Sequence, residues 1–206
     1  VRLIDQIRDS SVDVLIQGLY YAADVGCRVV NASFGSTAFS QAFEDAIESV
    51  CGSGTGGMLL VAAAHNQGVN NDSIPMYPAS FDLGRIISVA GTDRDDELGY
   101  TEPGYASNYG PTSVDLAAPG WDVLSAILPS VYYGTKSGTS MSAPQVTGTA
   151  ALIMGAHPTW SPDTIKAMIL AGIDTLSSLR GKVQTSGRLN AYKAFHGLTD
   201  GISPAA

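Results

Sequence analysis

The chain has 206 residues, of which 45% are hydrophobic and 15% are charged, and this composition predicts one compact domain with a substantial core. Its formal net charge of −8 argues against a nucleic-acid partner, because the sequence has no basic stripe that could neutralise phosphates. The longest apolar run, residues 58–64, is much shorter than the roughly 18–20 residues of a membrane span, so no membrane partner is expected.

Helical and strand-like patterns alternate in the first half of the chain. Apolar residues from Val12 to Ala23 follow the i, i+3, i+4, i+7 spacing of an amphipathic helix. Residues 28–33 form a short apolar run with β-branched side chains, which predicts a strand. A second amphipathic helix is expected over residues 43–50. The continuous apolar run MLLVAAA, residues 58–64, is typical of a strand that is buried on both faces.

The second half of the chain continues this alternation. Strands are expected at residues 86–90 and 114–118, and two short segments within residues 121–136, separated by a Pro-Ser pair, indicate a hairpin. A long helix is predicted from about Ser140 to Gly155, and another is predicted to begin after an N-cap at Ser161. Strands that alternate with helices favour parallel βαβ units, in which functional loops gather at the carboxyl ends of the strands.

One segment carries the clearest chemical signal, GTSMSAPQVTG at residues 138–148. Here Ser140 stands where a helix begins, so its hydroxyl points outward beside the free backbone N–H groups of the first turn. A nucleophilic serine needs this arrangement, because the tetrahedral oxyanion must meet donors that are already in place. The loops after Ser33, after Ala64 and before Ser140 are expected to converge at one edge of the sheet.

This segment resembles the serine motif of the subtilisin-like serine proteases, although the chain reads Ser-Ala-Pro-Gln at residues 142–145 where most of the family has Ala-Ser-Pro-His. The resemblance implies a three-layer α/β sandwich with a mostly parallel sheet, lacking its N-terminal portion. It further implies a serine endopeptidase that forms an acyl-enzyme on Ser140, and a secreted or extracellular location. Residues 1–198 would be the C-terminal portion of the peptidase domain and residues 199–206 a tail.

Two further segments match the family. AAAHNQG, residues 62–68, resembles the oxyanion segment and implies that Asn66 donates a side-chain hydrogen bond to the oxyanion. NASFG, residues 31–35, resembles the strand that lines one wall of the substrate channel. The resemblance implies that Ser33, Phe34 and Gly35 bind substrate along this wall. It also implies that Ala63 and Ala64, with His65 beside them, form the opposite wall of the P1 pocket and that Met76 forms its floor. A methionine floor without an acid favours an apolar or aromatic P1 side chain.

Histidines allow two interpretations. His65 occupies a position where the family usually has glycine, and it either lines the pocket, narrowing it or shaping its rim, or acts as a general base beside Ser140. The pocket-lining role is favoured, because the family's base comes from a separate helix. His157 is expected near the end of the long helix and His196 in the final helix, and neither is expected to be catalytic.

The other half of a catalytic triad has no match in the sequence. The family carries its acid in Asp-Ser-Gly or Asp-Thr-Gly and its base in His-Gly-Thr, whereas residues 174–176 read Asp-Thr-Leu and residues 196–198 read His-Gly-Leu. We expect the acid and base to come from a complementary N-terminal chain or segment that acts with this one on a peptide or protein substrate. The alternatives are an inactive peptide-binding module and an isolated structural fragment, which would leave a bare strand edge.

Three remaining features leave alternatives open. Cys27 and Cys51 form either a disulfide or two separate buried thiols, and the separate thiols are favoured. The acidic run at residues 93–97 is either a solvated loop, which is favoured, or a calcium site, since enzymes of this family often bind calcium. The glycine-rich residues 52–57 precede a strand instead of opening a helix, so we expect a loop there. Apart from the possible calcium ion, no metal or cofactor is expected.

Overall fold

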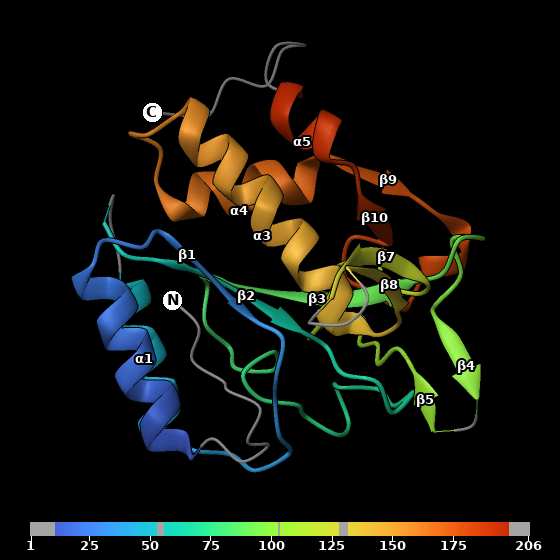
Figure 1. Ribbon diagram of the computed structural model, residues 1–206, viewed down its shortest axis with the longest axis horizontal. Helices are drawn as coiled ribbons and strands as arrows, with labels where there is room; N and C mark the ends of the chain where they lie inside the picture. The colour runs from blue at the N-terminus through green and yellow to red at the C-terminus, as the bar shows by residue number, and fades with distance from the viewer. Residues whose placement is uncertain (1–10, 53–55, 103, 128–131, 198–206) are drawn as a thin grey trace.

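The computed structural model describes residues 11–52, 56–102, 104–127 and 132–197. Its centre is a six-stranded sheet in the order β1-β2-β3-β6-β10-β9 (Figure 1). The strands are β1 (Val29–Ala32), β2 (Leu59–Ala63), β3 (Ile86–Thr92), β6 (Leu116–Pro119), β10 (Gly187–Leu189) and β9 (Ile173–Thr175). All neighbouring pairs from β1 to β10 are parallel, and β9 is antiparallel to β10. The predicted, mostly parallel sheet is confirmed.

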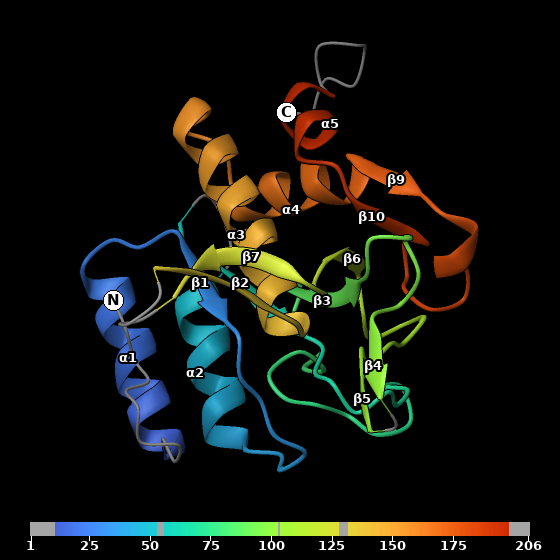
Figure 2. The ribbon, with the colours of Figure 1, turned by 45° about the vertical axis from the view of Figure 1, so that its right-hand side comes forward.

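Helices cover both faces of the sheet, which completes the expected three layers. α1 (Val12–Asp24) and α2 (Gln41–Cys51) stand side by side on one face (Figure 2). α3 (Thr139–Ala156), α4 (Pro162–Ala171) and α5 (Ala191–His196) cover the other face. Alternate residues of β2 take part in the two cores, because successive side chains of a strand point to opposite faces. All five residues of β2 are therefore buried, as the continuous apolar run predicts.

Local signals in the sequence set the beginnings of two helices. The Ser40 side chain accepts a hydrogen bond from Phe43 N at the start of α2. The predicted N-cap Ser161 accepts from Thr164 N at the start of α4, with Pro162 as the first helical residue. The strand predicted at residues 114–118 begins later, at Leu116, because Val114 N closes a turn onto Gly110 O.

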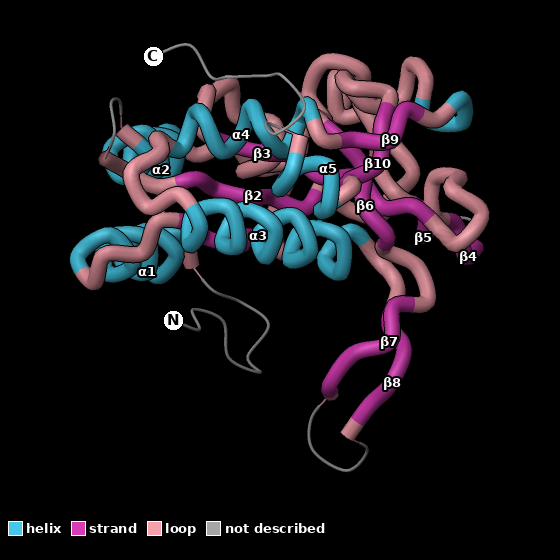
Figure 3. The backbone as a smooth tube through the Cα atoms, turned by 90° about the horizontal axis from the view of Figure 1, so that it is seen from above, coloured by secondary structure: helices cyan, strands magenta, loops and turns pink. Residues whose placement is uncertain are grey.

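The predicted hairpin is present as β7 (Val123–Ala126) and β8 (Tyr133–Lys136), and it extends away from the body of the molecule (Figure 3). The Pro-Ser pair proposed as its turn lies outside the described residues. A second small sheet pairs β4 (Tyr100–Glu102) with β5 (Tyr105–Ala106), and a 3-10 helix, η1, spans Ser177–Leu179. The predicted tail, residues 199–206, also lies outside the described part of the chain.

β1 forms one border of the sheet. Within the described residues it pairs with β2 alone, and three of its four residues retain solvent exposure, whereas β2 is buried throughout. The row of backbone groups on its outer side is therefore available for pairing with another strand.

Both cysteines are free thiols, which confirms the favoured interpretation of separate thiols, but only Cys51 is buried and Cys27 is partly exposed. Burial raises the pKa of Cys51 to about 11, while the positive charge of Arg85 acts in the opposite direction. Cys51 is consequently a protonated, inert thiol at neutral pH.

No helix in the described part of the chain combines the length and apolar character needed to cross a membrane.

Candidate active site

Ser140 lies in the first turn of α3, one residue after the helix begins. The residue before that start, Gly138, has φ +134°, a backbone conformation that strongly favours glycine. A methyl group built at Gly138 would lie 3.0 Å from the Tyr105 hydroxyl and 3.2 Å from Asn66 Nδ2. The glycine of the Gly-Thr-Ser motif thus allows the helix start to approach the segment that follows β2.

The nucleophile candidate is held against the segment that leaves β1. Ser140 Oγ donates to Ser33 O at 3.2 Å, and Ser33 Oγ donates in return to Ser140 O at 3.0 Å. These reciprocal bonds join positions 107 residues apart in the sequence. The expected convergence of the loops at the carboxyl ends of the strands is therefore present.

Asn66 approaches the same helix start through its side-chain oxygen. Asn66 Oδ1 accepts from Thr139 N at 2.8 Å and from Thr139 Oγ1 at 3.1 Å. Because the oxygen is engaged by Thr139, the amide nitrogen is turned to the other side of the carboxamide. Among the described residues Asn66 Nδ2 has no hydrogen-bond acceptor, and it lies 3.2 Å from the position of a methyl group built at Gly138.

The proposed pocket walls are connected by backbone pairing. After β1 the chain runs through Ser33, Phe34 and Gly35, and then Ser36 pairs antiparallel with Tyr77 through bonds of 2.9 and 2.8 Å. Of the other residues implied for substrate binding, Ala63, Ala64 and Met76 are all buried. The Ser36–Tyr77 pairing brings the segment after Gly35 beside the segment after Met76.

His65 occupies the space between these walls. Its backbone φ is +83°, and its Nε2 atom is buried without a hydrogen-bond partner of good geometry. The ring lies against Gly35, because a methyl group built there would be 2.4 Å from His65 Nε2. Burial lowers the pKa of His65, and an interaction with the Phe34 backbone opposes part of that shift. The ring thus lies against Gly35, and the Ser140 hydroxyl donates to a backbone carbonyl instead of to this ring.

The remaining histidines contact aromatic rings. His157 follows the last residue of α3 and stacks on Trp160 with ring centroids 3.6 Å apart. His196 contacts the rings of Tyr192 and Phe195 in α5.

Sequence reasoning missed two residues that organise the site. Thr139 is fully buried and bonds both Asn66 and the backbone N of His65, at 3.0 Å in the latter case. Tyr105 donates its hydroxyl to Ser137 O at 2.6 Å, just before the helix start. The Gly-Thr-Ser motif contained the signal for Thr139. No local pattern identified Tyr105, since it is 32 residues away from its partner.

The acidic run at residues 93–97 is engaged in local structure. Asp93 Oδ1 accepts from the backbone N of Asp95 and Glu97, and Asp96 pairs with Arg188. Within the described ranges, no group of three or more His, Cys, Asp or Glu side chains is arranged to hold a metal ion.

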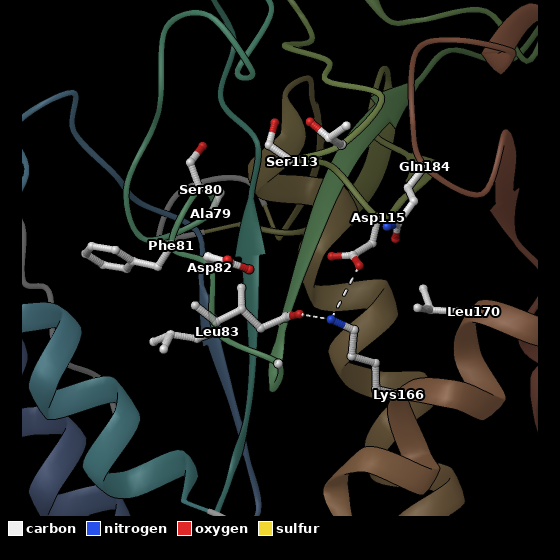
Figure 4. Close-up of a pocket in the computed structure, with 13 residues that line it drawn as sticks. Ala79, Ser80, Phe81, Asp82, Leu83, Ser113, Asp115, Lys166, Leu170 and Gln184 are labelled. Atoms are coloured by element: carbon white, nitrogen blue, oxygen red, sulfur yellow. Dashed lines mark hydrogen bonds and ion pairs between the residues drawn. The ribbon is translucent and has the colours of Figure 1, made fainter.

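A separate cavity of about 470 Å³ lies at the opposite end of the sheet, where β3 and β6 begin (Figure 4). Lys166 Nζ lies there 3.4 Å from Asp115 Oδ1 and donates to Ile86 O at 2.5 Å. Because the lysine charge is balanced by Asp115, this cavity presents no unpaired charge from the pair to a ligand.

Comparison with known proteins identifies the family of the chain. The model of the Peptidase S8, or subtilase, family matches residues 1–192. The chain belongs to the subtilase family. Thermitase from Thermoactinomyces vulgaris is 35% identical over 194 residues, a match that covers 94% of this chain and 63% of thermitase. Subtilisin Savinase from Lederbergia lenta is 32% identical over 194 residues, with 94% and 66% covered.

The subtilase fold is supported independently by solved structures. A chain from the subtilase cytotoxin SubAB assembly superimposes with a TM-score of 0.81 at 24% identity, covering 97% of this chain and 68% of that one. This likeness concerns the fold alone. The chain spans 63% and 66% of the length of thermitase and Savinase, so it corresponds to a part of those proteins.

Proposed function

We propose that this subtilase chain supplies the nucleophile, the oxyanion donors and the P1 pocket of a serine endopeptidase. Ser140 attacks the peptide carbonyl and forms an acyl-enzyme that water hydrolyses. Asn66 Nδ2 and the backbone N–H of Ser140 bind the oxyanion. The observation that supports the proposal is the Thr139 N to Asn66 Oδ1 bond of 2.8 Å, which holds the Asn66 side chain against the residue before Ser140 through its oxygen and leaves the amide nitrogen free to donate.

The acid and base of the triad are proposed to come from a complementary segment. Among the described residues, the Ser140 hydroxyl donates to Ser33 O and has no histidine partner. β1 leads directly into Ser33, and its outer side has no described strand beside it. A strand added along β1 would bring its own carboxyl-end loops next to Ser140, because the ends of parallel strands share one edge of a sheet.

Location outside the cell is part of the same proposal, and it rests on family membership. The relatives thermitase and Savinase are bacterial subtilases. Detection of the protein in the medium of its source cells, with a cytoplasmic marker absent, would support it.

A fluorophosphonate probe tests the nucleophile assignment in the assembled enzyme, that is, this chain together with its complementary segment. We expect one covalent adduct on Ser140 and none in Ser140→Ala. Ser142→Ala is the matched control, because Ser142 lies in the same helix turn but is fully buried, so labelling should persist. An adduct on a different residue contradicts the assignment. Peptide binding without any adduct would favour the inactive peptide-binding module.

A further inference from the structure

We propose that His65 is a specificity-determining residue whose imidazole occupies the space of the P1 side chain. The enzyme then accepts glycine or alanine at P1 and rejects large apolar, aromatic and acidic residues. This inference rests on the proposed function, and it narrows the apolar or aromatic P1 preference expected from Met76 alone to small side chains.

The direction of the side chain is set by the backbone. Residue 65 has φ +83°, in the left-handed region that glycine adopts freely and L-residues adopt at a cost. His65 N donates to Thr139 Oγ1 at 3.0 Å, and His65 O accepts from Asn108 N at 2.7 Å. With both backbone groups bonded, the Cα–Cβ direction is fixed and the ring is carried into the pocket.

The ring fills the narrow part of that pocket. A methyl group built at Gly35 would lie 2.4 Å from His65 Nε2, 3.0 Å from His65 Cδ2 and 2.6 Å from Tyr77 O. An extended substrate that pairs with residues 33–35 must direct its P1 side chain between this wall and Ala63–Ala64. The imidazole already stands at the Gly35 wall, so a leucine or phenylalanine side chain would overlap it.

The chemistry of the ring also disfavours an acidic P1 residue. His65 Nε2 is buried without a hydrogen-bond partner of good geometry, and burial, which the Phe34 backbone opposes only in part, lowers the pKa of His65 and favours the neutral imidazole. A neutral ring supplies no positive charge to offset the desolvation of a substrate carboxylate. Shape and charge therefore agree on small, uncharged P1 residues.

Peptide substrates that differ only at P1 test the inference in the assembled enzyme. We expect kcat/KM for alanine to exceed that for phenylalanine by at least about 10-fold, the discrimination that a few methylene groups provide in a tight pocket. His65→Gly should reverse the order, mainly by lowering KM for phenylalanine and leucine. Glycine suits φ +83°, so this variant relieves backbone strain and is expected to fold. His65→Asn, which tolerates the same conformation with a smaller side chain, should give an intermediate ratio.

Matched measurements separate this inference from the proposed function. His157→Ala removes a histidine at the far end of α3 and should leave the P1 ratio unchanged. If a fluorophosphonate labels Ser140 but the alanine-to-phenylalanine ratio is equal in wild type and His65→Gly, the inference is wrong and the proposed function stands. Peptide affinities of the Ser140→Ala protein report on the pocket without chemistry. Tighter binding of P1-phenylalanine than of P1-alanine peptides to Ser140→Ala would also overturn the inference.

Discussion

Thr139 shows how a single buried residue can organise the site. Its backbone N and its hydroxyl both engage Asn66 Oδ1, and the hydroxyl also accepts from His65 N. The same residue thus orients Asn66, the proposed oxyanion donor, and fixes the backbone of His65, whose ring is proposed to fill the P1 pocket. The two functions are coupled at this position, because a shift of Thr139 would move both neighbours.

At the residue scale, the Asn66 amide can be tested by removal. Removing the corresponding amide of subtilisin itself costs about 10²–10³ in turnover, and we expect a loss of the same order in kcat for Asn66→Ala, with KM nearly unchanged. The reason is that the Nδ2 donor acts on charge that develops only in the transition state. Steady-state kinetics measure the effect.

Asn70→Ala is the matched control, because Asn70 Oδ1 accepts from Asp72 N in the following turn and does not contact α3. An equal loss of kcat in both variants would indicate a general disturbance of the loop. Unchanged kcat in Asn66→Ala would remove the amide from the oxyanion site.

At the scale of elements, Arg85 joins three segments at the amino-terminal side of the sheet. Its side chain is 5% exposed and donates to Cys51 O at 2.6 Å, at the end of α2, and to Gly56 O at 2.7 Å. It also forms a two-pronged ion pair with Asp163 in the first turn of α4, with bonds of 2.9 and 2.6 Å. This ion pair lowers the pKa of Asp163 and raises that of Arg85.

We expect Arg85 and Asp163 to contribute differently to the free energy of unfolding. Arg85→Met should lower the free energy of unfolding by about 2–3 kcal/mol, because buried carbonyl groups lose a charged donor. Asp163→Asn should cost less than about 1 kcal/mol, since the Asp163 side chain is 60% exposed and solvent replaces its partner. Urea unfolding of the two variants measures the difference. Equal losses would show that the stabilisation resides in the ion pair and not in the carbonyl contacts.

At the scale of the whole molecule, the sequence predicts the long helices and the buried strands better than it predicts the short strands. The apolar run in β2 and the amphipathic spacing in α1 and α2 predicted alternating strands and helices, because burial on two faces or on one leaves a periodic pattern, whereas the three-layer sandwich was implied by the resemblance to the subtilisin-like proteases. β9 and β10 have three residues each, which is too short for any periodicity to be recognised.

The same difference between what the sequence predicts and what it does not applies to the candidate site. Ser140 and Asn66 were proposed from the sequence because their motifs are contiguous in it. The direction of the His65 ring was not, because it depends on a positive φ and on hydrogen bonds to Thr139 and Asn108, which no local pattern reveals. A side chain's orientation is a tertiary property even where its position in the motif is evident.

The border strand β1 gives a prediction for the whole assembly. In this chain alone, the outward-facing amides of β1 should exchange with solvent much faster than those of β2, which is paired on both sides. Adding the complementary segment should slow them by at least about 10-fold if a strand pairs there. Hydrogen exchange followed by NMR or mass spectrometry reports this. Amides of β1 that stay unchanged on activation of the enzyme would place the complementary segment elsewhere.

The hairpin β7–β8 ends at Lys136, only four residues before Ser140, yet the chain is fastened between them. Ser137 O accepts from the Tyr105 hydroxyl at 2.6 Å, Ser137 Oγ accepts from Asp122 N at 3.0 Å, and Gly138 N donates to Gly120 O at 2.7 Å. These hydrogen bonds hold residues 137 and 138 in place, so we expect bending of the hairpin to stop there and not to reach α3. For protein engineering, we expect that a label or a surface attachment on the exposed hairpin, for example at Leu124, leaves the proposed nucleophile Ser140 in position.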